Sequence, residues 1–204
     1  LFMLPTNGGE ALVVIAAILF GLTLPMTPAQ VLWINMVTSS TLGLALAFEP
    51  GEGDLMRRPP RAPGEPLLSR FFAWRVLMVS VLMMAAALGL FLWELERGTA
   101  LETARTMAVS TIVMAEMFYL LNSRFVLAPA LGRAGLGGNP VVAWALGACL
   151  LLQMAFVYLP PLQAVFGTTA LGAREWVGVG AAGLGVFVVA ELEKAAARAL
   201  IRQG

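Results

Sequence analysis

Apolar residues fill this chain in long runs rather than in the short alternations of a soluble domain. A helix needs about 20 apolar residues to cross the roughly 30 Å hydrocarbon core of a bilayer. Runs of about that length recur near 3–24, 29–48, 71–93, 104–121, 140–159 and 175–193. The pattern therefore predicts six membrane-spanning helices joined by polar or Gly/Pro-rich connections, the first of them a tight turn at Pro25 and Pro28.

Composition supports this interpretation. Of the 204 residues 59% are hydrophobic and 12% charged, none is His, and the mean hydropathy is +0.84, which excludes an ordinary soluble domain. We expect an all-α, polytopic membrane protein whose first partner is the lipid bilayer. The net charge of +1 and the lack of a basic helix indicate no nucleic-acid partner. Cys149 is the single cysteine, so a disulfide within the chain is impossible.

Basic residues predict the orientation of the chain, because they are enriched in short cytoplasmic loops. They cluster between spans two and three, between spans four and five, and after span six, whereas few lie in the alternate connections. We therefore expect a multi-pass protein of the plasma membrane with both ends cytoplasmic. The cytoplasmic set is Arg57, Arg58, Arg61, Arg70, Arg75, Arg124, Arg133, Lys194, Arg198 and Arg202, and the opposite set is Arg97, Arg105 and Arg174.

Polar side chains inside the apolar runs are the candidate functional residues. An ionised carboxylate at membrane depth costs several kcal/mol unless it faces a partner, a cavity or an ion. Asn7 and Glu10 are three residues apart, so they share one helix face, and the two glycines between them allow close approach of a neighbour. Glu116 lies within the fourth run.

The second run carries a matching polar stripe of Asn35, Thr38 and Ser39 at positions i, i+3 and i+4. Carboxylate, amide and hydroxyl oxygens without His or thiolate suit Na⁺, K⁺, Ca²⁺, Mg²⁺ or Mn²⁺. Asn, Thr and Ser in membrane helices also commonly hydrogen-bond their own backbone or a neighbouring helix. The predicted metal ligands are Asn7, Glu10, Asn35, Thr38, Ser39 and Glu116, whereas Glu191 and Glu193 beside Lys194 are interpreted as interfacial charges.

Four segments together resemble a known family: "NGGEALVV", "PAQVLWINMVTSSTLGLALAFEP", "DLMRRPPR" and "AEMFYLLNSR". They are similar to the carboxy-terminal transmembrane half of type II P-type ATPases, the group that includes the sarcoplasmic-reticulum calcium pump. The resemblance covers essentially the whole chain, from within the family's fifth membrane helix to the end of its tenth. It implies that Asn7, Glu10, Asn35, Thr38 and Glu116 match the family's ion ligands.

The resemblance also has two departures. Ser39 stands where calcium and sodium pumps of the group carry an Asp, which removes one negative charge from the implied site. The phosphorylated Asp of the family's Asp-Lys-Thr-Gly-Thr motif, the nucleotide-binding and actuator domains and the first four membrane helices are not in these residues. We therefore predict no catalytic and no cofactor-binding residue here, and ATP and Mg²⁺ act only through the domains outside the chain.

The resemblance implies the membrane part of an ATP-driven cation pump, organised as an ion-binding hairpin (1–48), a cytoplasmic Arg/Pro-rich loop (49–70) and a four-helix support domain (71–204). The remainder of that pump is then its partner, and we expect the chain to be a piece of a longer polypeptide. Two alternatives stay open. One is a small stand-alone cation transporter or channel-like protein, and the other is an accessory membrane subunit whose two carboxyls pair across helices.

Overall fold

The computed structural model describes residues 2–49, 70–124, 130 and 139–203. The predicted Arg/Pro-rich loop therefore lies outside the described residues, apart from Glu49 and Arg70. The described chain is helical. Its elements are α1 (Met3–Leu19), α2 (Pro28–Thr38), the π-helical turn η1 (Ser39–Gly43), α3 (Leu44–Ala47), α4 (Arg70–Glu96), α5 (Leu101–Ser123), α7 (Pro140–Tyr158), α8 (Pro160–Phe166) and α9 (Ala173–Gln203).

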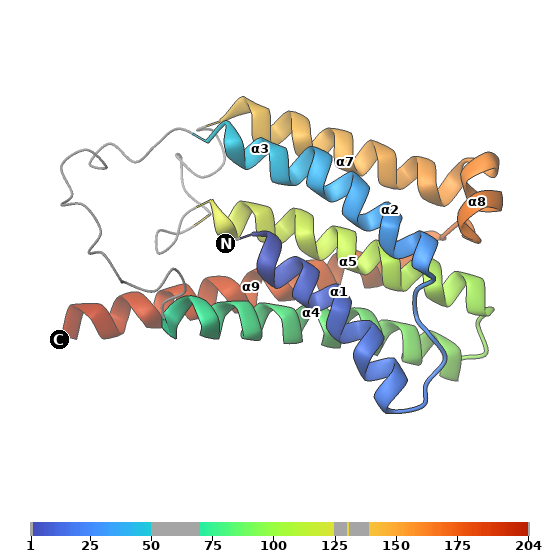
Figure 1. Ribbon diagram of the computed structural model, residues 1–204, viewed down its shortest axis with the longest axis horizontal. Helices are drawn as coiled ribbons and strands as arrows, with labels where there is room; N and C mark the ends of the chain where they lie inside the picture. The colour runs from blue at the N-terminus through green and yellow to red at the C-terminus, as the bar shows by residue number, and fades with distance from the viewer. Residues whose placement is uncertain (1, 50–69, 125–129, 131–138, 204) are drawn as a thin grey trace.

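The long helices form a bundle whose axes follow the long dimension of the molecule (Figure 1). α5 occupies the centre and is the most deeply buried of the long helices. The continuous helix made by α2, η1 and α3 lies beside α7, whereas α4 and α9 lie on the other side of α5. α1 crosses obliquely and packs mainly on α4. This arrangement brings the second and fourth predicted spans into contact with each other, while the first span packs across α4.

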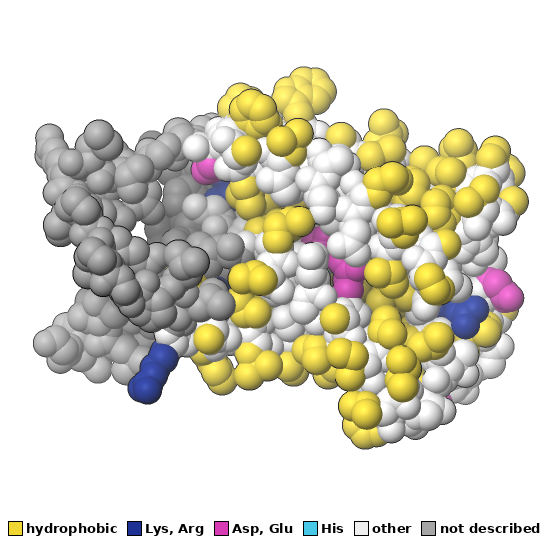
Figure 2. All heavy atoms as spheres, in the orientation of Figure 1, with side chains coloured by type: hydrophobic (Ala, Val, Ile, Leu, Met, Phe, Trp, Pro, Cys, Tyr) yellow, Lys and Arg dark blue, Asp and Glu magenta, His cyan; other side chains and the backbone are white. Residues whose placement is uncertain are grey.

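Length and composition support the predicted membrane spans. Five of the described helices are long and apolar enough to cross a bilayer: Pro28–Ala47, Arg70–Glu96, Leu101–Ser123, Pro140–Tyr158 and Ala173–Ala199. The sixth predicted span is the shorter apolar helix Met3–Leu19. Many of their large hydrophobic side chains are exposed on the outside of the bundle (Figure 2), as expected for a surface that faces lipid.

Three boundaries differ from the prediction. α1 ends at Leu19 instead of residue 24, because Gly21 adopts a left-handed φ of 63° that ends the helical ladder. α9 continues to Gln203, ten residues beyond the predicted end of the last span. The connection after α7 contains the short helix α8, with Pro160 at its first position and Gly167 in the left-handed conformation behind its end.

Local sequence signals explain where α2 begins. Thr27 accepts a hydrogen bond from the backbone of Gln30, whose side chain accepts one from the backbone of Thr27, and Pro28 occupies the first helical position. This capping box follows the predicted turn at Pro25 and Pro28. Gln30 also donates to the carbonyl of Phe166, which ties the start of α2 to α8.

Candidate cation site

Two glycines bring Glu10 into the bundle. A Cβ built on Gly9 would lie 2.8 Å from Cβ of Met83 in α4, and one on Gly8 would collide with Oγ of Ser80. The hydroxyl of Ser80 donates to the carbonyl oxygen of Pro5, 2.9 Å away. α1 and α4 therefore touch almost backbone to backbone, and the Glu10 side chain is directed to the other side of α1.

Glu10 meets the polar stripe of α2. The Asn35 side chain donates from Nδ2 to Oε2 of Glu10 at 2.6 Å and to the carbonyl of Val31 at 3.1 Å. The Asn35 amide acts as a donor in both contacts, so its own carbonyl oxygen remains available as a ligand. The other carboxylate oxygen of Glu10, Oε1, is buried and has no hydrogen-bond partner among the described residues.

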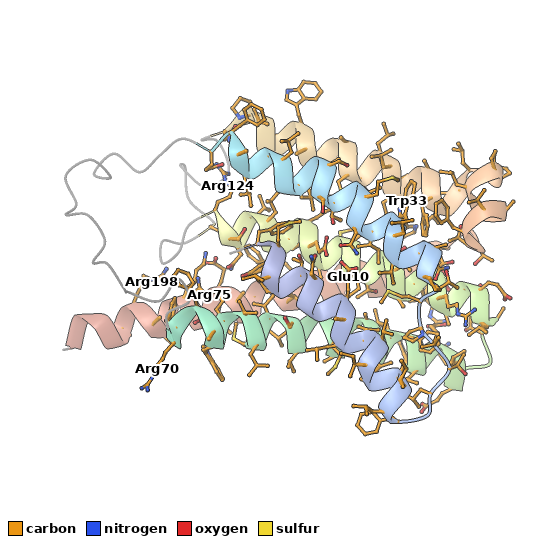
Figure 3. All side chains as sticks on the ribbon, in the orientation of Figure 1. Glu10, Trp33, Arg70, Arg75, Arg124 and Arg198 are labelled. Carbon is orange, nitrogen blue, oxygen red and sulfur yellow. The ribbon has the colours of Figure 1, made fainter. Side chains whose placement is uncertain are left out.

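A groove of about 500 Å³ opens between α1 and α2 beside this pair. Figure 3 labels Glu10 near the middle of the bundle, and acidic atoms are visible at the same place on the surface in Figure 2. Asn7 is exposed and lies at this groove, on the same face of α1 as Glu10. The lining residues are Asn7, Glu10, Ala11, Val14, Ile15, Val31 and Asn35.

Glu116 closes the inner side of the site. It lies on α5, is fully buried, and both of its carboxylate oxygens lack a hydrogen-bond partner in the described part of the chain. The carboxyl of Glu10 and the hydroxyl of Thr38 lie close enough to interact with it. Two adjacent carboxylates in an apolar bundle repel each other, so this arrangement requires a cation or protons to compensate it.

Ser39 has no hydrogen bond to Glu10 or Glu116 within the described residues. Ser39 is half-buried and is the first residue of η1, and its side chain makes no hydrogen bond within the described residues. The next two hydroxyls bond back to the helix: Ser40 to the carbonyl of Met36, and Thr41 to that of Val37 at 2.6 Å. A π-helical turn is frequently found at functional sites, and here it begins directly after Thr38.

Sequence reasoning missed the contribution of α7. The thiol of Cys149 lies next to Thr41 and within electrostatic reach of Glu116, although a lone cysteine in an apolar run gave no signal beyond packing. Further along α7, Gln153 donates to Ser110 of α5 at 3.0 Å, and its own amide oxygen is buried without a partner among the described atoms. Gln153 is a polar residue within an apolar run, and that position could have indicated a polar contact with another helix.

Another polar cluster lies away from the carboxylate pair. Lys194, interpreted from the sequence as part of an interfacial group, is completely buried and donates to Glu191 at 2.9 Å and to the carbonyl oxygen of Asn122 at 2.6 Å. The Asn122 side chain donates to Glu191 at 2.7 Å. These contacts join the end of α5 to α9, so Asn122 serves packing in the described structure and is no part of the site.

Similarity to known proteins identifies the chain. The family model described as "Cation transporting ATPase, C-terminus" matches residues 23–196. The chain belongs to the cation-transporting ATPase family. It is the C-terminal membrane region of such an ATPase, and this agrees with the described helices and with the resemblance found in the sequence.

Curated relatives of this ATPase region come from distant organisms. The probable cation-transporting ATPase F of Mycobacterium tuberculosis is 44% identical over 91% of this chain. A calcium-transporting ATPase of Bacillus subtilis is 33% identical over 86%, and the human calcium-transporting ATPase type 2C member 2 is 29% identical over 95%. The chain spans about one fifth of the length of these relatives.

The donor set of this ATPase region suits a hard cation. Carboxylate, amide and hydroxyl oxygens gather from α1, α2 and α5. No group of three or more His, Cys, Asp and Glu side chains that could hold a metal occurs within the described residues. The site therefore offers two carboxylates, and further ligands must be neutral oxygens or come from elsewhere in the ATPase.

Proposed function

We propose that this chain forms the transport site of an ATP-driven cation pump. The observation that carries the proposal is the pair of adjacent buried carboxyls, Glu10 and Glu116, which together present three oxygens without hydrogen-bond partners among the described residues. A cation placed between them would remove their mutual repulsion and supply the missing partners. Asn7, Asn35 and Thr38 would add neutral oxygens, and Ser39 would join only if η1 rearranges.

Ca²⁺ is the cation that we propose as cargo. Relatives from Bacillus subtilis and human are named calcium-transporting ATPases. Ca²⁺ takes six to eight oxygen ligands in flexible geometry, which fits a mixed set of carboxylate, amide and hydroxyl groups. Two carboxylates balance the charge of one such ion, so we propose one Ca²⁺ per cycle from this site, with protons replacing the ion on the carboxylates after release.

The groove beside Glu10 faces the part of the pump that lies outside this chain. Asn7 and the open wall between α1 and α2 would be covered by the preceding membrane helices, which would complete the ligand shell. ATP and Mg²⁺ act in the cytoplasmic domains of the whole pump, whose movements would open the site to each side of the membrane in turn. This step is supported by the length of the chain, which spans only about one fifth of the length of its relatives.

The test uses the full-length pump that contains this chain. We measure phosphorylation from ATP as a function of Ca²⁺ concentration. We expect Glu10→Gln and Glu116→Gln each to raise the half-saturating Ca²⁺ concentration at least a hundredfold. Glu94→Gln is the matched control, because Glu94 is also a buried carboxylate but is paired with Arg174 and Thr99 in contacts remote from the site. Unchanged Ca²⁺ affinity in both site variants would refute the assignment, and Mn²⁺ in the same assay would test the choice of cation.

We also propose that the pump lies in the plasma membrane with both ends of this chain in the cytoplasm. Arg70, Arg75, Arg124 and Arg198 lie toward one end of the bundle (Figure 3), as the enrichment of basic residues on the cytoplasmic side predicts. In a variant lacking Cys149, Ala100→Cys should react with an impermeant maleimide in intact cells, and Arg70→Cys only after permeabilisation. The reverse pattern would invert the orientation.

A further inference from the structure

A buried ion pair joins the helix that carries Asn35 and Thr38 to the helix that carries Glu116. Glu49 follows the last turn of α3, and Arg124 caps the end of α5. Nε and Nη2 of Arg124 lie 3.0 and 2.8 Å from the same oxygen, Oε1 of Glu49. The Arg124 side chain is only 2% exposed and that of Glu49 20%. Within the described residues no other ion pair connects these two helices.

A third residue holds the second oxygen of the same carboxylate. Asn139 precedes α7, and its Nδ2 donates to Oε2 of Glu49 at 3.0 Å and to the carbonyl of Phe48 at 3.1 Å. Its Oδ1 accepts the backbone N–H of Val141 and so caps α7. The two carboxylate oxygens of Glu49 therefore accept hydrogen bonds from the ends of two different helices, which fixes the orientation of the carboxylate. We call Glu49, Arg124 and Asn139 the helix-end clamp.

The helix-end clamp lies a similar distance along both helices from the proposed site. Glu49 follows Thr38 by eleven residues, about 16 Å of helix, and Arg124 follows Glu116 by eight, about 12 Å. Both residues lie toward the same end of the bundle, where Figure 3 labels Arg124. Because helices are stiff along their axes, fixing their ends fixes how far one has slid along the other, and hence which residues of α2 face Glu116.

We propose that Glu49 and Arg124 are positioning residues for the cation site, which deepens the proposed function and rests on it. They touch no cation. They hold α2 and α5 in the axial register that sets Thr38 and Asn35 against Glu116 and Glu10. Asn139 extends the same grip to α7, whose Cys149 lies next to Thr41. A change in the clamp should therefore alter Ca²⁺ affinity more than maximal phosphorylation.

The variants follow from the hydrogen bonds. Glu49→Gln leaves one acceptor for donors on two sides, so either Arg124 or Asn139 loses its contact. Arg124→Lys keeps the charge but cannot place two N–H groups on Oε1. Measured on the full-length pump, we expect half-saturating Ca²⁺ to rise about tenfold in Glu49→Gln and about threefold in Arg124→Lys, with maximal phosphorylation within twofold of wild type.

The matched control is the buried ion pair Arg75–Glu193, which has similar exposure and a 2.6 Å contact but joins α4 to α9, neither of which supplies a site residue. Glu193→Gln and Arg75→Lys should lower the unfolding temperature without moving half-saturating Ca²⁺ more than twofold. Equal effects on Ca²⁺ affinity in both ion pairs would overturn the positioning role. So would an unchanged affinity in Arg124→Lys, should Glu49→Gln fail to fold.

Glu116→Gln separates the two proposals. If it abolishes the Ca²⁺ response while Glu49→Gln and Arg124→Lys stay within twofold of wild type, the site stands and the clamp does not position it. If Glu116→Gln leaves the Ca²⁺ response unchanged, the proposed function fails together with the role of the clamp.

Discussion

The close contact between α1 and α4 allows a sharp test of how Glu10 is positioned. In Gly9→Ala the new Cβ would lie 2.8 Å from Cβ of Met83, whereas ordinary contacts begin at 3.4 Å. The two helices must therefore separate locally by about 0.6 Å. Met83 cannot move aside easily, because the contacting atom is its Cβ, whose position is fixed by the backbone of α4. Glu10 is the next residue along α1, so the same displacement moves its carboxylate.

A second glycine makes it possible to isolate the free energy that the tight packing at Gly9 costs in Gly9→Ala. Overpacking a tight contact costs about 1–3 kcal/mol, whereas Gly→Ala within a helix gains up to about 1 kcal/mol in propensity. Gly89 lies within α4 and a Cβ there would meet nothing within 4 Å, so Gly89→Ala carries the propensity gain alone. The difference between the two variants is then the packing cost at Gly9, about 1–3 kcal/mol.

Thermal unfolding of the purified pump in detergent, read together with Ca²⁺-dependent phosphorylation, measures both consequences. We expect Gly9→Ala to unfold below the wild-type temperature and Gly89→Ala at or above it. Half-saturating Ca²⁺ should rise in Gly9→Ala only. If the two variants unfold at the same temperature, the contact with Met83 is looser than described and the reasoning about helix approach is wrong.

Three further predictions use the same assays. Asn35→Ala removes the 2.6 Å hydrogen bond to Glu10, a bond to a charged group worth about 1.5–3 kcal/mol, and should weaken Ca²⁺ affinity about tenfold to a hundredfold; wild-type affinity would contradict the pairing. Thr27→Ala removes the cap of α2 and should cost about 1 kcal/mol of stability at unchanged affinity, so a shifted affinity would count against a purely local role. Lys194→Met leaves Glu191 without its buried cation and should cost about 3–5 kcal/mol, which an unaltered unfolding temperature would disprove.

The sequence predicted the helices well because bilayer thickness imposes a length on each apolar run. All six runs appear as apolar helices, and the turn before α2 follows from Pro25, Pro28 and the Thr27 cap. The predicted helix bounds are wrong where the apolar pattern continues but the helical conformation ends, as at Gly21 after α1. The short helix α8 was not predicted, because two prolines signalled only the end of the preceding span.

The candidate site was only partly predictable. Intramembrane carboxylates are costly, so Glu10 and Glu116 stood out from their surroundings without any structural knowledge. Helical spacing predicted that Asn7 shares a face with Glu10 and Asn35 with Thr38, and Asn7 and Glu10 line one groove in the structure. Spacing could not show that Ser39 begins a π-helical turn, because that depends on the backbone hydrogen bonds of the folded helix.

The pattern of apolar and polar residues along the chain was enough to predict the solvent of this protein, the number and approximate length of its apolar helices, and the residues too polar to be explained by packing. These properties depend on the composition of one segment at a time. The packing of the helices was needed to show that Glu10 and Glu116 are neighbours, that Lys194 is buried, and that Glu49 contacts Arg124 and Asn139. Such contacts join residues more than 70 positions apart, so they depend on how helices pack and not on the pattern within any one of them.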